Sequence, residues 1–102
     1  MVQGGPFRLR FTDEAASTLR ELESSPSTAT KLKKVQKALG FLSVDPGYPG
    51  LRSHKYSSLS GANGEDVWDS YVENNTPSAW RIFWHYGPGA DAITVVSITP
   101  HP

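Results

Sequence analysis

Three short runs in the second half of the chain constrain its fold more than any other feature. Residues 67–73, 80–86 and 93–99 are each rich in aromatic and β-branched side chains, which is the composition of β-strands. The linkers between them, 74–77 and 87–91, carry the Asn, Pro, Gly and Asp residues that form turns. Strands joined by such short linkers are neighbours in a sheet, so these runs predict an antiparallel meander.

The beginning of the chain predicts a strand followed by a helix. Residues 7–11 alternate apolar and basic side chains with the period of a half-buried strand. Thr12 is a suitable N-cap, and the two acidic residues after it would meet the positive end of a helix dipole. Because Pro26 cannot continue a helix, we expect this helix at residues 13–24.

A second helix is predicted to start after Ser27 or Thr28. Its apolar side chains recur at the three- and four-residue spacing of an amphipathic helix: Leu32, Val35, Leu39 and Leu42. Residues 45–64 contain several Pro and Gly residues and are expected to be irregular. The resulting order is β-α-α-β-β-β. It predicts an α+β fold in which both helices cover one face of an antiparallel sheet and leave the other face open.

Composition limits the classes of protein that the chain can belong to. With 102 residues it has the size of a single domain, which we expect to span 1–102. It has no cysteine, which excludes disulfides and thiolate metal sites and makes a cytoplasmic location the default expectation. No long apolar stretch is present, and residues 1–6 lack the features of a signal peptide. Neither secretion nor a membrane partner is expected.

Charge is distributed unevenly, although ten Lys and Arg balance ten Asp and Glu. Residues 31–55 are basic, with Asp45 as their only acid, whereas residues 56–102 are acidic, with Arg81 as their only Lys or Arg. The basic stretch has two interpretations. It is either a solvated helix face or a strip that faces phosphate or a partner protein.

The alternation along the last two strands predicts which side chains reach the open face. The core-facing set of the middle strand is expected to be Trp80, Ile82, Trp84 and Tyr86. The set on the open face is then Arg81, Phe83 and His85. In the last strand the expected core-facing set is Thr94, Val96 and Ile98. This parity puts His101 on the open face, so Arg81 and His101 are candidate neighbours.

The order of these elements and several segments resemble the RelE/ParE toxin superfamily over nearly the whole chain. The segments are residues 59–61 ahead of a strand with Trp68, the arginine-led strand 80–84, and the terminal strand ending at 98–102. The resemblance implies the toxin of a type II toxin–antitoxin system, with a cognate antitoxin as its partner. It also implies a ribosome-associated endoribonuclease, in which the 2′-hydroxyl of the messenger RNA attacks the adjacent phosphodiester without a metal or other cofactor.

The resemblance also implies roles for individual residues. Arg81 matches the arginine that such toxins place on the scissile phosphate, and His101 falls near a C-terminal histidine or basic residue that acts as acid or base. Asp69 or Glu73 could serve as the base in branches that use a carboxylate. Further basic residues are candidates for contacts to RNA: Lys34, Arg52, His54 and Lys55.

Each of these residues also has a purely structural interpretation. An arginine at the start of a strand is often salt-bridged, and His101 lies at the very end of the sequence. His54 beside Lys55 could be a solvated loop pair, and His85 a packed or surface imidazole. The spacing of the three histidines matches no metal motif, so no metal site is expected.

One departure from the family pattern leaves two other functions open. Active RNA-cutting members usually carry basic residues on the strand that here reads 67–73, and this strand is acidic. The first alternative is a gyrase-directed toxin of the same superfamily, which acts by binding a topoisomerase. The second is a non-catalytic protein-binding module whose groove holds a partner segment, contacted by the aromatic residues Trp80, Phe83 and Trp84.

Overall fold

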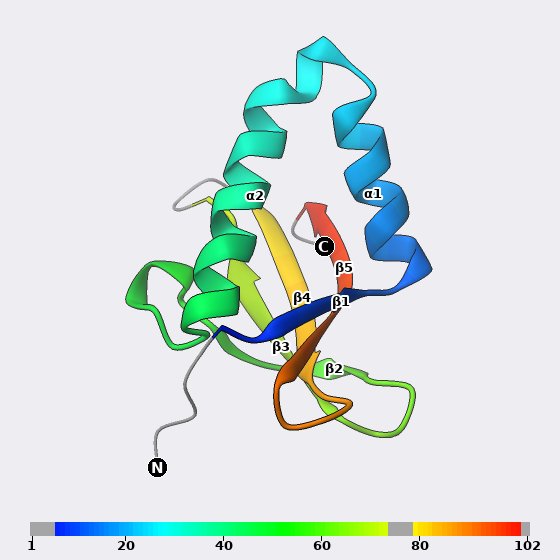
Figure 1. Ribbon diagram of the computed structural model, residues 1–102, viewed down its shortest axis with the longest axis vertical. Helices are drawn as coiled ribbons and strands as arrows, with labels where there is room; N and C mark the ends of the chain where they lie inside the picture. The colour runs from blue at the N-terminus through cyan, green and yellow to red at the C-terminus, as the bar shows by residue number, and fades with distance from the viewer. Residues whose placement is uncertain (1–5, 74–78, 101–102) are drawn as a thin grey trace.

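The computed structural model describes residues 6–73 and 79–100. It has the predicted α+β architecture, with α1 and α2 packed on a five-stranded sheet of order β1-β5-β4-β3-β2 (Figure 1). Two single turns of 3₁₀ helix, η1 and η2, flank α2. In chain order the elements are β1 Arg8–Phe11, α1 Asp13–Glu23, η1 Pro26–Thr28, α2 Ala29–Val44, η2 Pro49–Leu51, β2 His54–Ser60, β3 Asp66–Tyr71, β4 Trp80–Tyr86 and β5 Ala92–Pro100.

The sheet differs from the prediction in two ways. It is mixed, because β1 pairs in parallel with β5, whereas β2, β3, β4 and β5 pair antiparallel in sequence order. It also contains β2, in the stretch that was expected to be irregular. Hydrophobic periodicity does not predict β2, because its sequence, HKYSSLS, shows no alternation of apolar and polar residues and the strand is mostly exposed. Its ends are held by β3, through the pairs His54 with Asp69 and Ser60 with Asp66.

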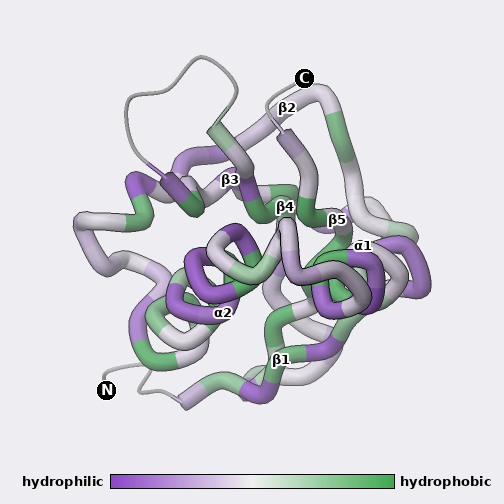
Figure 2. Tube along the Cα trace, turned by 90° about the horizontal axis from the view of Figure 1, so that it is seen from above, coloured by the Kyte–Doolittle hydropathy of each residue, from purple (hydrophilic) through white to green (hydrophobic). Residues whose placement is uncertain are grey.

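The two helices form where their caps and apolar spacing predicted them. Thr12 caps α1, with its hydroxyl oxygen accepting from the backbone N–H of Ala15 at 3.1 Å. Both helices bury one face against β4 and β5, and Figure 2 shows the hydrophobic segments of these strands next to them. The core so formed includes Ala15, Leu22, Val35, Ala38, Leu39, Leu42, Ile82, Trp84, Ile93, Val95 and Ile98. No helix of the described part of the chain is long and apolar enough to cross a membrane.

A bulge in β5 changes the parity that simple alternation predicted. Trp84 pairs with Val95 and Phe83 with Ser97, so Val96 is an extra residue between the two pairs. The side chains in the core are consequently Ile93, Val95 and Ile98. The prediction is therefore right for Ile98 and wrong for Thr94 and Val96. The bulge is fixed from outside the sheet, because the Thr12 hydroxyl donates to the Val96 carbonyl at 2.6 Å.

The middle strand follows its predicted parity at most positions. Ile82 and Trp84 are in the core, and Trp80 packs against it. Tyr86 was expected there too, but it lies at the end of β4 and is 48% exposed. His101, the expected neighbour of Arg81, lies outside the described residues.

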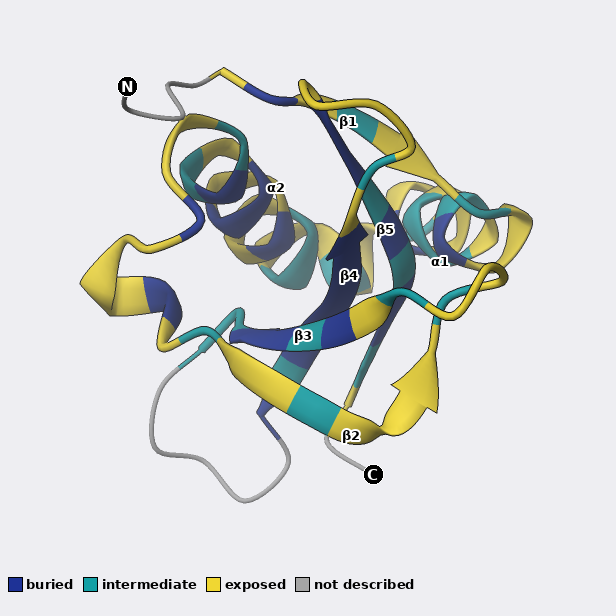
Figure 3. Ribbon diagram, turned by 90° about the horizontal axis from the view of Figure 1, so that it is seen from below, coloured by how far each residue is buried: buried dark blue, intermediate teal, exposed yellow. Residues whose placement is uncertain are grey.

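The sheet face opposite the helices is less open than predicted. Arg81, Phe83 and His85 lie on it, and all three are buried. Part of the cover comes from β2, since the Tyr56 ring packs on the Phe83 ring with 4.9 Å between centroids. Figure 3 shows β2 as an exposed strand passing along buried β3. This face stays accessible at both ends of β2, beside the exposed His54 at its start and in a hollow lined by His85, Thr94 and Val96 near its end.

Candidate functional site

A buried carboxylate organises the polar groups on this face. Asp69 in the middle of β3 is 2% exposed. Its Oδ2 accepts from Arg81 Nη1 at 2.6 Å and lies 3.4 Å from His54 Nε2. The strand register explains the arrangement, because His54 is the cross-strand partner of Asp69 and Arg81 is that of Tyr71. We call Arg52, His54, Asp69, Tyr71 and Arg81 the Asp69 cluster.

The Tyr71 ring links the two arginines of the Asp69 cluster. The Arg81 guanidinium carbon lies 3.8 Å from the centroid of this ring, and that of Arg52 lies 5.2 Å from it. Both distances are typical of cation–π contacts. Arg52 follows η2 with a left-handed backbone, φ 50°, which costs about 1 kcal/mol or more for a residue other than glycine. Its side chain is exposed and available to an anion beside His54.

Arg81 has a different environment from the one that its predicted role requires. Its side chain is only 9% exposed, and its Nη1 is engaged by Asp69. Among the described residues, Arg81 Nε has no hydrogen-bond partner. A buried guanidinium is tolerated only when it is paired, and Asp69 supplies the opposite charge. Direct contact between Arg81 and a phosphate would require the guanidinium to leave this arrangement.

His54 is the accessible titratable group of the Asp69 cluster. Its side chain is 49% exposed. Its Nδ1 lies 3.0 Å from the Arg52 carbonyl oxygen, and its Nε2 faces the Asp69 carboxylate. Both neighbours are acceptors, so only the doubly protonated ring can donate to both. Proton exchange between this ring and a bound molecule would therefore require one of these two contacts to open.

The structure does not bring every predicted residue into this cluster. Lys34 of α2 binds Glu73 at 3.3 Å, and Lys31 binds the same carboxylate. The hydrogen bond from Lys31 holds the pKa of Glu73 below its usual value of 4.5, with a smaller contribution from Lys34. Lys55 pairs instead with Asp66 at 3.4 Å, in the β2–β3 hairpin. Arg52, His54, Asp69 and Arg81 are thus together, and Lys34, Lys55 and Glu73 bind elsewhere.

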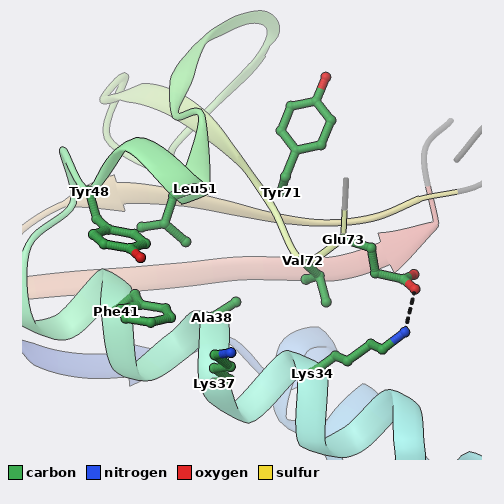
Figure 4. Close-up of a pocket in the computed structure, with 10 residues that line it drawn as sticks. Lys34, Lys37, Ala38, Phe41, Tyr48, Leu51, Tyr71, Val72 and Glu73 are labelled. Carbon is green, nitrogen blue, oxygen red and sulfur yellow. Dashed lines mark hydrogen bonds and ion pairs between the residues drawn. The ribbon is translucent and has the colours of Figure 1, made fainter. Parts of the chain in front are cut away.

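A groove adjoins the cluster on the side of α2. It has a volume of about 470 Å³ and runs between α2, η2 and the end of β3 (Figure 4). Its most exposed aromatic residue is Tyr48, whose ring stacks on Phe41 with 4.3 Å between centroids and 5° between planes. Its lining residues are Lys34, Lys37, Ala38, Phe41, Tyr48, Gly50, Leu51, Tyr71, Val72 and Glu73.

Sequence reasoning missed the bridging role of Asp69, the place of Tyr71 and the groove around Tyr48. Asp69 and Tyr71 share the parity that puts Arg81 on this face, so the alternation of β3 and β4 contained part of the signal. The contact with His54 was not readable, because it depends on β2. In the described ranges, no group of three or more His, Asp or Glu side chains converges in a way that could hold a metal ion.

No known protein family and no curated protein sequence matches the chain. Solved structures do match it. The YoeB/ParE toxin from Agrobacterium tumefaciens has a TM-score of 0.68 at 13% identity, covering 93% of this chain and 99% of that one. RelE in the archaeal RelE–RelB complex from Pyrococcus horikoshii OT3 has a TM-score of 0.62 at 14% identity, covering 93% and 94%.

A third structure extends the agreement. The YoeB dimer from Staphylococcus aureus has a TM-score of 0.61 at 12% identity and covers 95% of this chain and 99% of that one. Each match spans nearly the whole of both chains. The chain therefore has the fold of the RelE/ParE toxin superfamily.

Proposed function

We propose that this chain is the toxin of a type II toxin–antitoxin system and a metal-independent endoribonuclease that cuts messenger RNA on the ribosome. The toxin fold supports the general class. The main support for the proposed ribonuclease activity is the Asp69 cluster, in which an accessible histidine lies beside an exposed arginine and a buried carboxylate. These are the groups that a phosphodiester transfer requires.

In the proposed reaction the 2′-hydroxyl oxygen attacks the adjacent phosphorus, and the bond from phosphorus to the 5′-oxygen breaks. The attacking hydroxyl loses a proton and the leaving oxygen gains one. His54 is our candidate for the acid, because its ring is half exposed and lies beside the exposed Arg52 and the Asp69 carboxylate. His101, which lies outside the described residues, stays our candidate for the second proton transfer.

The two arginines have separate roles in this proposal. The Arg52 fork can make two parallel hydrogen bonds to the phosphate, where negative charge grows in the transition state. Arg81 was predicted for that contact. Because its Nη1 binds Asp69, we propose instead that it acts as a positioning residue that holds the Asp69 carboxylate in place beside His54.

The test is a cleavage assay with a defined message in a purified translation system. His54→Gln should lower the cleavage rate by about 10²- to 10⁴-fold, the usual worth of a positioned proton donor. Ser58→Ala, an exposed change on the same strand, should cut like the original chain. Full cleavage by His54→Gln would remove this histidine from the mechanism, and an uncut message with the original chain would reject the ribonuclease function.

A second function is favoured by one observation. The pairing of Arg81 with Asp69 buries the only Lys or Arg of the acidic half of the sequence, which leaves β3 and β4 without an exposed cation. A gyrase-binding toxin, or a protein-binding module, needs no such cation. Under the gyrase function, growth arrest comes with intact messages and damaged DNA, whereas a binding module causes no arrest.

We also propose a cognate antitoxin as a protein partner and the cytoplasm as the location. One of the structures of this fold is RelE in a complex with RelB, which supports a partner of that kind. Co-expression with a neighbouring small gene product should relieve the growth arrest, and the two chains should co-purify. A chain that arrests growth regardless of any neighbour-encoded protein would contradict this partner.

A further inference from the structure

We propose that the groove beside α2 binds one nucleotide of single-stranded RNA, with Tyr48 as the stacking surface for the base and Lys37 as the contact to its phosphate. This inference rests on the proposed ribonuclease function and extends it to a subsite for recognition. Three features of the groove support this assignment: its stacked aromatic pair, its positive charge and its position beside the Asp69 cluster.

The aromatic pair provides a preformed flat surface. Tyr48 is 39% exposed although its ring lies parallel to that of Phe41. Gly50 makes room for this position, since a Cβ atom there would lie 2.6 Å from Tyr48 Cε2. Because the exposed ring is already held in place by a second ring, little side-chain conformational entropy is lost when a base stacks on it. Such stacking accepts any base, since every base has a flat aromatic face.

The groove also has an excess of positive charge. Lys31 and Lys34 share the single carboxylate of Glu73. Lys37 has no ion-pair partner among the described residues, and its ammonium lies 5.9 Å from the centroid of the Phe41 ring. Lys37 lies over Phe41, and Phe41 stacks on the exposed Tyr48, so the groove offers a cation and a flat ring for the two parts of a nucleotide, its phosphate and its base. The carboxylates of an acidic peptide would bind Lys37 but would not stack on the Tyr48 ring.

Continuity with the Asp69 cluster favours RNA over a protein ligand. Tyr71 lines the groove and also contacts Arg52 and Arg81. In this proposal, RNA whose scissile phosphate lies at Arg52 and His54 reaches the groove past η2, which lines the groove with Gly50 and Leu51 and is followed directly by Arg52. Figure 4 shows Tyr48 and Phe41 stacked at one end of the groove, Lys34 and Lys37 on the α2 side, and the Tyr71 ring turned away from them. One base beyond the cut would then stack on Tyr48.

The experiment measures binding separately from cleavage. The full chain carrying His54→Gln is titrated into a fluorescein-labelled, single-stranded RNA of mixed sequence, and the dissociation constant is read from fluorescence anisotropy. Tyr48→Ala should raise this constant by roughly 5- to 100-fold, as expected when one base–aromatic stack is lost. Lys37→Ala should raise it and make binding less sensitive to salt, because one phosphate contact is removed. Lys33→Ala, on the same helix but outside the groove, should change neither property.

A pair of glycine substitutions tests the position of the ring without removing it. Gly50→Ala must displace Tyr48 and should weaken RNA binding, whereas Gly40→Ala, which meets no atom within 4 Å, should not. Unchanged RNA affinity in folded Tyr48→Ala and Gly50→Ala proteins would overturn the inference, even if the original chain cleaves messages. Loss of antitoxin binding instead of RNA binding would overturn it in favour of a protein groove. Failure of cleavage alone, with RNA binding still dependent on Tyr48, would reject the ribonuclease and not this site.

Discussion

Asp69 is the residue on which the proposed site depends most. Its carboxylate is the shared acceptor of a buried arginine and an accessible histidine, and it is itself almost fully buried. A site assembled in this way couples stability to function. Replacing Asp69 would leave the buried Arg81 charge without its counter-ion and so lower the free energy of unfolding. The same change would remove the carboxylate that holds the His54 ring.

Asp69→Asn should destabilise the fold strongly. Removing one partner of a buried ion pair leaves an uncompensated charge, which costs about 3–5 kcal/mol. Urea unfolding of the purified variant measures this loss. The double variant Asp69→Asn/Arg81→Gln removes the orphaned charge and should recover part of it. If the losses of the two single variants simply add in the double variant, the pair does not couple as described.

Glu73 gives a prediction on pH. Its pKa is lower in the folded chain than its usual value of 4.5, chiefly because Lys31 donates a hydrogen bond to it. Its ion pairs therefore stabilise the fold at pH values above 4.5, and this contribution is lost as the pH falls through the lowered pKa. Glu73→Gln should cost about 0.5–1 kcal/mol at pH 7, since the lysines are partly solvated.

The measurement is urea unfolding of Glu73→Gln and the original chain at pH 7 and pH 3. The difference should be clear at pH 7 and should shrink at pH 3. Glu23→Gln, which removes a carboxylate without an ion pair among the described residues, is the control for charge alone. An equal deficit at both pH values would show that the loss does not come from the ionised carboxylate.

At the scale of elements, α2 joins the core to the groove. One side of it is buried through Val35, Leu39 and Leu42, and another side presents Lys34 and Lys37 to the groove. Gly40 lies inside this helix on its exposed surface, where nothing lies within 4 Å of an added Cβ. A glycine inside a helix costs conformational entropy without any gain in packing here.

Gly40→Ala should therefore stabilise the chain by about 0.5–1 kcal/mol. Thermal unfolding followed by circular dichroism should show a rise in Tm of a few degrees, since 1 kcal/mol shifts a domain of this size by about 4–8 °C. Gly64→Ala is the contrasting control, because Gly64 has φ of +84° and an alanine there is strained. A lower Tm for Gly40→Ala would mean that the helix is not continuous at this position.

Most of the helices and strands could be predicted from the sequence. Both helices and the strands β3, β4 and β5 have clear periodicity, caps or turns, and their positions were predicted to within a few residues. β2 has no periodicity of its own and forms because β3 offers it an edge. The β5 bulge depends on Thr12, which lies 84 positions away along the chain. Contacts of this kind are set by tertiary structure, so local patterns do not contain them.

In the candidate site, too, local sequence patterns predicted some features, whereas others depend on tertiary contacts. The parity of β4 placed Arg81 correctly on the face opposite the helices. Its burial and its partner could not be read from that parity, because both depend on how β2 and β3 close over this face. His54 was predicted as a contact to RNA or as part of a solvated loop pair with Lys55, and not as a partner of Asp69. Its pairing with Asp69 becomes visible once β2 is known to be a strand.

At the scale of the whole molecule, the two oppositely charged parts of the sequence neutralise each other in space. Lys31 and Lys34 meet Glu73, and Lys55 meets Asp66. Three lysines of the basic stretch are therefore compensated locally by acidic residues. The cationic groups that remain at the Asp69 cluster and the groove are Arg52, His54 and Lys37, so RNA binding there should depend on a few side chains and not on overall charge.

The central claim is that this chain cuts messenger RNA with His54 in the Asp69 cluster. The most direct test is to induce the original chain and His54→Gln separately in bacterial cells and map the 5′ ends of messages within minutes. We expect growth arrest and new ends inside translated codons with the original chain, and a loss of both with His54→Gln at equal protein level. Arrest with intact messages, or the same new ends with both chains, would contradict the account.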